Sequence, residues 1–190
     1  DDTAARHQGN NAYTNVIGNP LFASFTTTPS KSRVNFLKLL RVPHDEYVLD
    51  EDALEYMKNQ GLSQKRLARL AAVIRNGTRI FRGDNVWQRQ LRRWGIRGEE
   101  PQRIVTEGAL VGTLLHYELY LDQPLLSDDA GQFDIPGFLH ALCWLHAERP
   151  LRKHLPLSPR EQEALERIRK DVWKYYRRLN AYRKSPTPAQ

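Results

Sequence analysis

The sequence is poor in cysteine and has no long apolar run. Its one cysteine, Cys143, cannot form an internal disulfide, so we expect a reducing compartment, the cytoplasm. No stretch reaches the length of a membrane span, and no charged-then-apolar segment opens the chain as a signal peptide would. It also lacks a phosphate-cradling glycine loop and a nucleophile motif, which argues against a metabolic enzyme with an unusual acidic site.

The balance of charge favours an anionic partner. The 190 residues are 40% hydrophobic and 27% charged, which suits one globular domain, and their net charge is +7. Nucleic acid is the commonest partner of such a basic chain, although a solvated basic surface explains the same composition. The chain opens on Asp1 without a methionine and closes on a polar stretch, 185–190, with nothing to pack, so we expect a fragment with a disordered tail.

The first fifty residues predict strands and one helix. Stretches 11–17 and 21–28 are rich in β-branched and aromatic residues and are separated by a Gly-Asn-Pro turn, which indicates an antiparallel hairpin. Ser30 or Ser32 can cap a helix that runs to about residue 41. Residues 47–49 are short and apolar, as expected of a further strand.

The middle of the chain predicts mostly helices. We expect helices at 51–60 and 63–75 and a Trp-bearing, Arg-rich stretch at 87–97, which together form an all-helical elaboration over 51–98. A further helix is expected over 107–120 with Thr106 as its cap, and its small residues suit close packing on a sheet.

A short apolar strand, 124–127, then leads to Asp128-Asp129, and a second apolar run covers 138–145. The last helix has the clearest start: Ser158 is the cap, Pro159 lies in the first turn and Glu161 completes a capping box. Apolar residues alternate three and four apart along it, as in a coiled coil, so we expect a long helix that pairs with another. These seam residues are Leu165, Ile168, Val172, Tyr175, Leu179 and Tyr182.

Two acidic pairs, Asp1-Asp2 and Asp128-Asp129, adjoin predicted strands. Carboxylates that converge from neighbouring strand ends can hold two Mg²⁺ ions on a scissile phosphate, although Asp-Asp is also common in turns and helix caps. His140, Cys143 and His146 lack the second thiolate pair of a zinc site, so structural roles are favoured. The apolar neighbours of Cys143 argue against a nucleophilic thiol.

Several segments of the sequence resemble those of the transposases of the insertion-sequence-66 type, which are bacterial members of the ribonuclease-H-like DDE superfamily. The matching segments are DDTAARH at 1–7, SKSRVNFLKLLR at 30–41, TEGALVGTLL at 106–115, SDDAGQF at 127–133 and HALCWLHAERPL at 140–151. They extend over nearly the whole chain in the order that the family has.

The resemblance implies a site and its cofactor. It places the first catalytic, metal-binding aspartate on Asp1, with Asp2 as the alternative, and the second on Asp128, with Asp129 as the alternative. The complete family site holds two Mg²⁺ or Mn²⁺ ions. The third acid of the family, a glutamate on a helix downstream of a helical insertion, has no match here. Three glutamates at a suitable distance are disfavoured because their helix has a coiled-coil seam and the first is explained by capping: Glu161, Glu163 and Glu166.

The resemblance also implies a fold and partners. We expect a ribonuclease-H-like mixed α/β sheet flanked by helices, with helical insertions and a long C-terminal helix. The expected parts are 1–50 and 101–157 as the core, 51–100 as a helical insertion, and 158–190 as the start of a helical hairpin and then the tail. The parent protein would be a cytoplasmic, nucleoid-associated transposase, a homo-oligomer that cuts transposon ends and joins them to target DNA without any membrane association.

The fragment itself is expected to be inactive because the third acid is missing. The alternative is a non-catalytic DNA-binding or assembly module derived from a transposase. Candidate DNA contacts, each of which is equally compatible with plain surface, are Arg92, Arg93, His146, Arg149, Lys170, Lys174 and Arg177.

Overall fold

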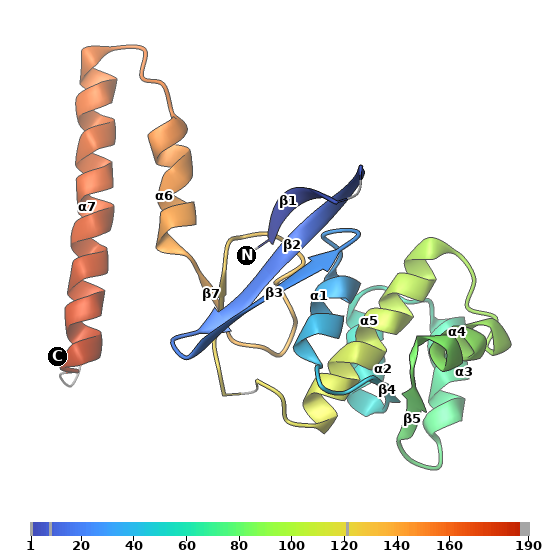
Figure 1. Cartoon of the computed structure of the whole chain (residues 1–190). Coiled ribbons are helices and arrows are strands. Elements are labelled where there is room, and N and C mark those ends of the chain that lie inside the picture. The colour runs from blue at the N-terminus through green and yellow to red at the C-terminus, as the bar shows by residue number, and fades with distance from the viewer. Residues whose placement is uncertain (1, 8, 121, 187–190) are drawn as a thin grey trace. The chain divides into compact units, whose positions relative to one another are not determined.

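The computed structural model describes residues 2–7, 9–120 and 122–186. The chain is mixed α/β and divides into two compact units (Figure 1). The first unit comprises Asp1–Leu125 and Ala130–His140, and the second comprises Leu126–Asp129 and Ala141–Gln190. None of the helices among the described residues is both long and apolar enough to cross a membrane.

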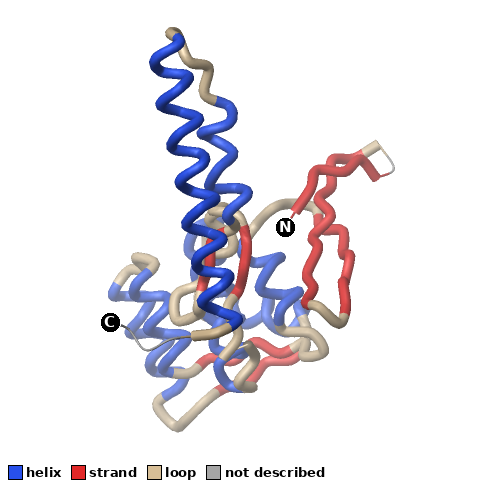
Figure 2. The backbone as a smooth tube through the Cα atoms, turned by 90° about the vertical axis from the view of Figure 1, so that its left-hand side faces the viewer, coloured by secondary structure: helices blue, strands red, loops and turns tan. Residues whose placement is uncertain are grey.

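The first unit opens with a three-stranded antiparallel sheet. Its strands are β1 (Asp2–His7), β2 (Asn10–Asn19) and β3 (Phe22–Thr28), in the order β1-β2-β3 (Figure 2, red). The side chain of Asn19 closes the β2–β3 turn, since its Oδ1 accepts hydrogen bonds from the backbone N–H groups of Leu21 and Phe22 at 2.8 and 3.2 Å. The predicted hairpin is confirmed, and β1 lies at an edge of the sheet.

A helix and a second small sheet follow. Helix α1 (Arg33–Leu40) begins after Ser32, whose side chain accepts a hydrogen bond from the N–H of Asn35 at 3.2 Å, so Ser32 rather than Ser30 is the cap. Strand β4 (Glu46–Leu49) is buried and pairs antiparallel with β5 (Arg79–Arg82). Strand β5 corrects the prediction that 51–98 is all helical, because the short Arg-Ile-Phe-Arg segment takes its structure from pairing with β4.

The two helices predicted from the middle of the chain are present as α2 (Glu51–Asn59) and α3 (Gln64–Ile74), and α4 (Asp84–Arg93) covers much of the Trp-bearing, Arg-rich stretch. They belong to the same unit as the first sheet, and their apolar faces enter the same core, since Met57, Leu70 and Trp87 have no exposed surface. The indole of Trp87 stacks on the ring of Tyr47 with a centroid distance of 4.7 Å.

Helix α5 (Glu99–His116) is the central element of this core (Figure 1). The prediction that it starts at residue 107 with Thr106 as its cap is wrong. Gly98 precedes the helix, and Thr106 lies buried inside it, where its hydroxyl accepts a hydrogen bond from the indole N–H of Trp87 at 3.0 Å. The helix ends at His116, before residue 120, and positive φ angles of 52° at Glu118 and 62° at Tyr120 do not continue it.

Two glycines let α5 lie close to its neighbours, as its small residues predict. A Cβ atom at Gly112 would lie 2.7 Å from the carbonyl oxygen of Val48 in β4, and one at Gly108 would lie 2.7 Å from Cγ of Met57 in α2. Contacts this short do not occur between real side chains, so glycine is required at both positions.

The remaining elements are β6 (Leu125–Ser127), β7 (His140–Leu142), α6 (Trp144–Lys153) and α7 (Pro159–Lys184). The second apolar run, 138–145, thus forms β7 and the start of α6. In the described part of the chain the strands make three separate sheets, β1-β2-β3, β4-β5 and β6-β7, so a single ribonuclease-H-like sheet stays a prediction. The tail lies outside the described residues from 187 onward.

Candidate functional site

The second acidic pair follows β6 directly, as predicted. Ser127, the last residue of the strand, is buried, and its carbonyl accepts a hydrogen bond from the N–H of Cys143 at 2.8 Å. Its hydroxyl donates to the carbonyl oxygen of Asp128 at 2.7 Å. The backbone carbonyls before and after the Cα atom of Asp128 are therefore both held by hydrogen bonds. Asp128 is half-buried, whereas Asp129 is exposed.

The first acidic pair is described only in part. Asp1 lies outside the described residues, and Asp2 begins β1, opposite Asn15 of β2. Asp2 belongs to the first unit and Asp128 to the second, so the convergence of the two pairs stays a prediction. Among the described residues, no group of three or more His, Cys, Asp or Glu side chains is placed to hold a metal ion.

Arg33 connects three of the sequence segments that resemble the transposase family. It is the first residue of α1, and its Nη2 donates a hydrogen bond to the carbonyl oxygen of Gly131, in the loop after the acidic pair, at 2.5 Å. Its Nη1 donates to the hydroxyl of Tyr56 at 3.1 Å and lies 3.9 Å from the carboxylate of Glu107. The ring of Phe36, one turn further along α1, meets that of Phe133 edge to face at 4.8 Å.

Glu107 is a buried carboxylate that the sequence analysis did not single out. It is 1% exposed, its oxygens accept hydrogen bonds from Arg103 at 3.0 and 3.2 Å, and one of them accepts from the hydroxyl of Tyr56 at 2.9 Å. Burial, and then the nearby charge of Glu107, raise the pKa of Tyr56 to about 12. Tyr56 therefore stays protonated and donates. The sequence signal that could have predicted this cluster is the single acid, Glu107, within the otherwise mostly apolar segment TEGALVGTLL.

Two of the candidate DNA contacts, His146 and Arg149, lie on α6. Arg149 is exposed, whereas His146 is half-buried and its buried Nδ1 atom has no hydrogen-bond partner among the described residues. Between them Glu148, which is 4% exposed, accepts a hydrogen bond from Nε of Arg169 in α7 at 2.6 Å. This half-buried ion pair, which the sequence analysis missed, joins the two helices of the second unit.

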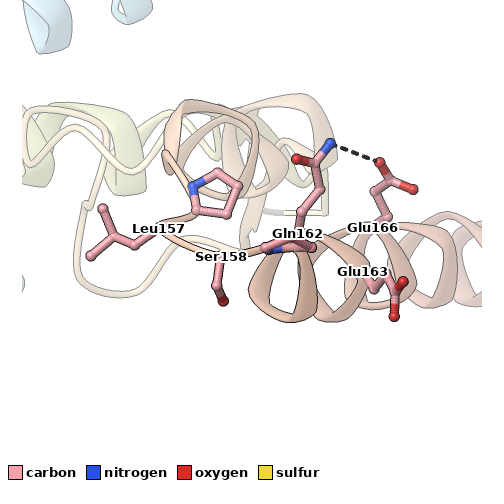
Figure 3. A pocket seen from close by; sticks show the side chains of 7 residues that line it. Leu157, Ser158, Gln162, Glu163 and Glu166 are labelled. Atoms are coloured by element: carbon pink, nitrogen blue, oxygen red, sulfur yellow. Dashed lines mark hydrogen bonds between the residues drawn. The ribbon is translucent and has the colours of Figure 1, made fainter.

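The glutamates at the start of α7 lie at a cap and beside an open hollow. Ser158 accepts a hydrogen bond from the N–H of Glu161 at 3.3 Å, and the Glu161 carboxylate accepts one from the N–H of Leu157 at 2.8 Å, one residue before the cap. The predicted cap is confirmed, with that shift. Glu163 and Glu166 line a hollow of about 510 Å³ (Figure 3). Gln162 donates a hydrogen bond to Glu166, one turn further along α7, at 3.4 Å.

The other candidate DNA contacts are exposed. Arg92 and Arg93 occupy the last turn of α4 in the first unit. Lys170, Lys174 and Arg177 lie along α7 in the second unit. Exposure is compatible with phosphate contacts and with an ordinary surface, so the geometry leaves both interpretations open.

Comparison with known proteins finds a relative over almost the whole length of this chain. The chain is 37% identical over 190 residues to an uncharacterized protein, y4jO, of Sinorhizobium fredii (strain NBRC 101917 / NGR234). The match covers 99% of this chain and 58% of the relative, so the chain spans little more than half of that protein's length. No family model matches the chain, and no solved structure matches it.

Proposed function

We propose that this chain is a section of the catalytic core of a DNA transposase of the ribonuclease-H-like kind, similar to the insertion-sequence-66 type. The observation that carries the proposal is the placement of both acidic pairs at strands: β1 begins at Asp2, and Asp128 follows β6 at once. Carboxylates at strand ends are what metal-dependent phosphodiester cleavage and strand transfer require.

The contacts of Arg33 support the same proposal. The Arg33 side chain contacts two segments that lie up to about a hundred residues away in the sequence. It contacts Glu107 of TEGALVGTLL and Gly131 of SDDAGQF. Three sequence segments that resemble one family therefore belong to one packed region of the fold. The region lies directly beside the loop that follows Asp129 in the chain.

The edge position of β1 is a further support. It pairs with β2 on one side, and no strand among the described residues pairs with its other side. In the proposed ribonuclease-H-like sheet, the strand of the second acid would lie beside the strand of the first. Such a pairing requires a strand edge without a partner, as β1 has among the described residues.

Asp128 and Asp129 have the right chemistry for Mg²⁺ or Mn²⁺ but do not make a complete site. Carboxylate oxygens are the ligands that Mg²⁺ prefers, yet the described residues bring no third ligand to this pair. Bound ions would stabilise the attacking and leaving oxygens of a phosphodiester. With two acids at most, we expect weak metal binding and no DNA cleavage by this chain alone.

Calorimetry with Mg²⁺ and with Mn²⁺ tests the proposal. We expect weak binding by the unchanged chain, a loss in Asp128→Asn, and no change in Asp134→Asn, whose exposed carboxylate lies in the same loop. Asp129→Asn decides which member of the pair binds. Equal binding by the chain and all three variants would contradict the assignment of the acids.

The second candidate function is a non-catalytic DNA-binding or assembly module. Exposed arginines and lysines of α4 and α7, which are accessible to a phosphate backbone, support it. Under this alternative the chain binds DNA in the presence of EDTA with a strong salt dependence and shows no Mg²⁺ binding. In either case the proposed setting is the bacterial nucleoid, with a homo-oligomeric parent protein.

A further inference from the structure

Helix α7 is 26 residues long, and none of its residues is buried. Four of its six seam residues are exposed hydrophobics: Ile168 by 49%, Tyr175 by 53%, Leu179 by 39% and Tyr182 by 53%. A helix in a folded protein normally buries its apolar stripe, and a continuous exposed one marks an interaction surface.

Helix α6 is too short to cover the whole of this stripe, although Leu165 and Val172 are half-buried. Its 10 residues extend about 15 Å, whereas the 26 residues of α7 extend about 39 Å. The two helices run side by side over only part of α7 (Figures 1 and 2). Their contacts are the Glu148–Arg169 ion pair and the ring of Trp144 against those of Tyr175 and Tyr176, at 6.0 and 5.8 Å. Leu179 and Tyr182 lie beyond them.

The seam is complementary to itself in one direction. Its spacing alternates three and four residues and reads the same from either end. When a second α7 lies antiparallel, each seam residue therefore meets another: Leu165 meets Tyr182 of the second copy, Ile168 meets Leu179, and Val172 meets Tyr175. This register has twofold symmetry, so the contacts form twice and the interface closes.

The charges beside the seam select the same direction. Asp171 and Arg178 are exposed, lie seven residues apart and flank the seam on one side. In the antiparallel register, Asp171 of each copy faces Arg178 of the other. Glu161 and Glu163, near the start of each helix, also lie near Arg183 and Lys184 in the last turn of the other copy, although Arg160 beside them is basic. Parallel copies would place basic turn against basic turn.

We propose that α7 is a self-association helix that pairs antiparallel with α7 of a second copy of this chain. The interface combines the exposed seam residues with two symmetry-related Asp171–Arg178 ion pairs. It needs neither metal nor DNA, so it stands or falls separately from the proposed catalytic ancestry.

Sedimentation equilibrium of the whole chain tests this pairing, with a charge exchange as the diagnostic. The unchanged chain should show a dimer fraction that rises with concentration. Asp171→Arg and Arg178→Asp should each reduce it, because like charges then meet. An equimolar mixture of the two variants should restore it, since every flanking pair between the two different chains is then opposite in sign.

The control is Arg177→Asp, which makes the same charge change on the side of α7 away from the seam and should leave the dimer fraction close to that of the unchanged chain. Circular dichroism checks that all variants keep their helices. An unchanged chain that stays monomeric up to its solubility limit overturns the proposal. A mixture that fails to associate while the unchanged chain dimerises overturns the antiparallel register.

Discussion

The guanidinium of Arg33 and the carboxylate of Glu107 lie 3.9 Å apart, although they are separated by more than seventy positions in the chain. Arg33 begins α1, and Glu107 lies in the middle of α5. The pair fixes α1 against the central helix, and the second guanidinium nitrogen of Arg33 then reaches the loop after Asp129 through Gly131. A single side chain thus links the core to the acidic loop.

The first prediction concerns Glu107. Glu107→Gln should destabilise the first unit by about 3 kcal/mol, because it removes a buried charge that Arg33, Arg103 and Tyr56 all contact. Urea denaturation measures the change. Glu163→Gln, at an exposed glutamate, is the matched control and should stay within about 0.5 kcal/mol. Equal stabilities for the two variants would show that the buried pair does not hold the core together.

The second prediction concerns the loop after the acidic pair. Arg33→Lys keeps the charge but cannot reach Gly131 and Tyr56 at the same time with a planar fork. Backbone amides of 130–134 should therefore exchange with deuterium faster in this variant than in the unchanged chain. Arg89→Lys, at an exposed position of α4, should leave the exchange of that loop unaltered. Unchanged exchange in Arg33→Lys would mean that the Phe36–Phe133 contact holds the loop by itself.

The third prediction concerns the close approach of α5 to β4. In a free helix Gly→Ala stabilises by about 1 kcal/mol. Gly112→Ala should instead destabilise by about 1–3 kcal/mol, because the added methyl would lie 2.7 Å from the backbone oxygen of Val48. Thermal unfolding gives the sign. Gly131→Ala is the control, since nothing lies within 4 Å of its added methyl and it should be nearly neutral.

The fourth prediction concerns pH. The pKa of Tyr56 is raised to about 12 in the folded protein, above its ordinary value of about 10, so the folded state keeps the proton longer than the unfolded state does. The contribution of Tyr56 is therefore complete below pH 10 and is lost as the pH rises toward 12. The stability difference between the unchanged chain and Tyr56→Phe should shrink over that window. A difference that stays constant from pH 8 to pH 11.5 would contradict this assignment.

The fifth prediction concerns DNA. If the arginines at the end of α4 contact phosphates, Arg92→Gln should weaken binding to every duplex sequence and lower the slope of log affinity against log salt by about 1. Lys58→Gln, at an exposed lysine of α2, should leave the slope as it was. Fluorescence anisotropy over a salt series measures both. Identical slopes for the two variants would assign Arg92 to the ordinary solvated surface.

Local signals in the sequence predicted local structure well. The hairpin, the caps at Ser32 and Ser158 and the stop near Gly61 all depend on residues that lie near one another in the chain. The errors arose where distant residues decide the structure. Strand β5 exists because it pairs with β4, and Thr106 is a partner of Trp87 instead of a cap.

The residues of the candidate site likewise fall into those that short-range patterns predict and those that depend on a distant partner. The position of Asp128 after a strand follows from the apolar residues just before it, and it was predicted. The clusters around Glu107 and Glu148 were not, because each depends on an arginine on another element, Arg33 of α1 and Arg169 of α7. Whether the two acidic pairs meet depends on pairing across the whole chain, which short-range patterns do not encode.

The division of the chain into two units limits which fragments of it keep the second unit whole. The backbone passes from one unit to the other between Leu125 and Leu126, returns between Asp129 and Ala130, and passes over again between His140 and Ala141. The two aspartates therefore belong with the helical hairpin, although sequence on both sides of them belongs elsewhere. A proteolytic cut near residue 140 would release both helices and leave the acids behind. No single continuous piece shorter than 126–190 can carry the second unit intact.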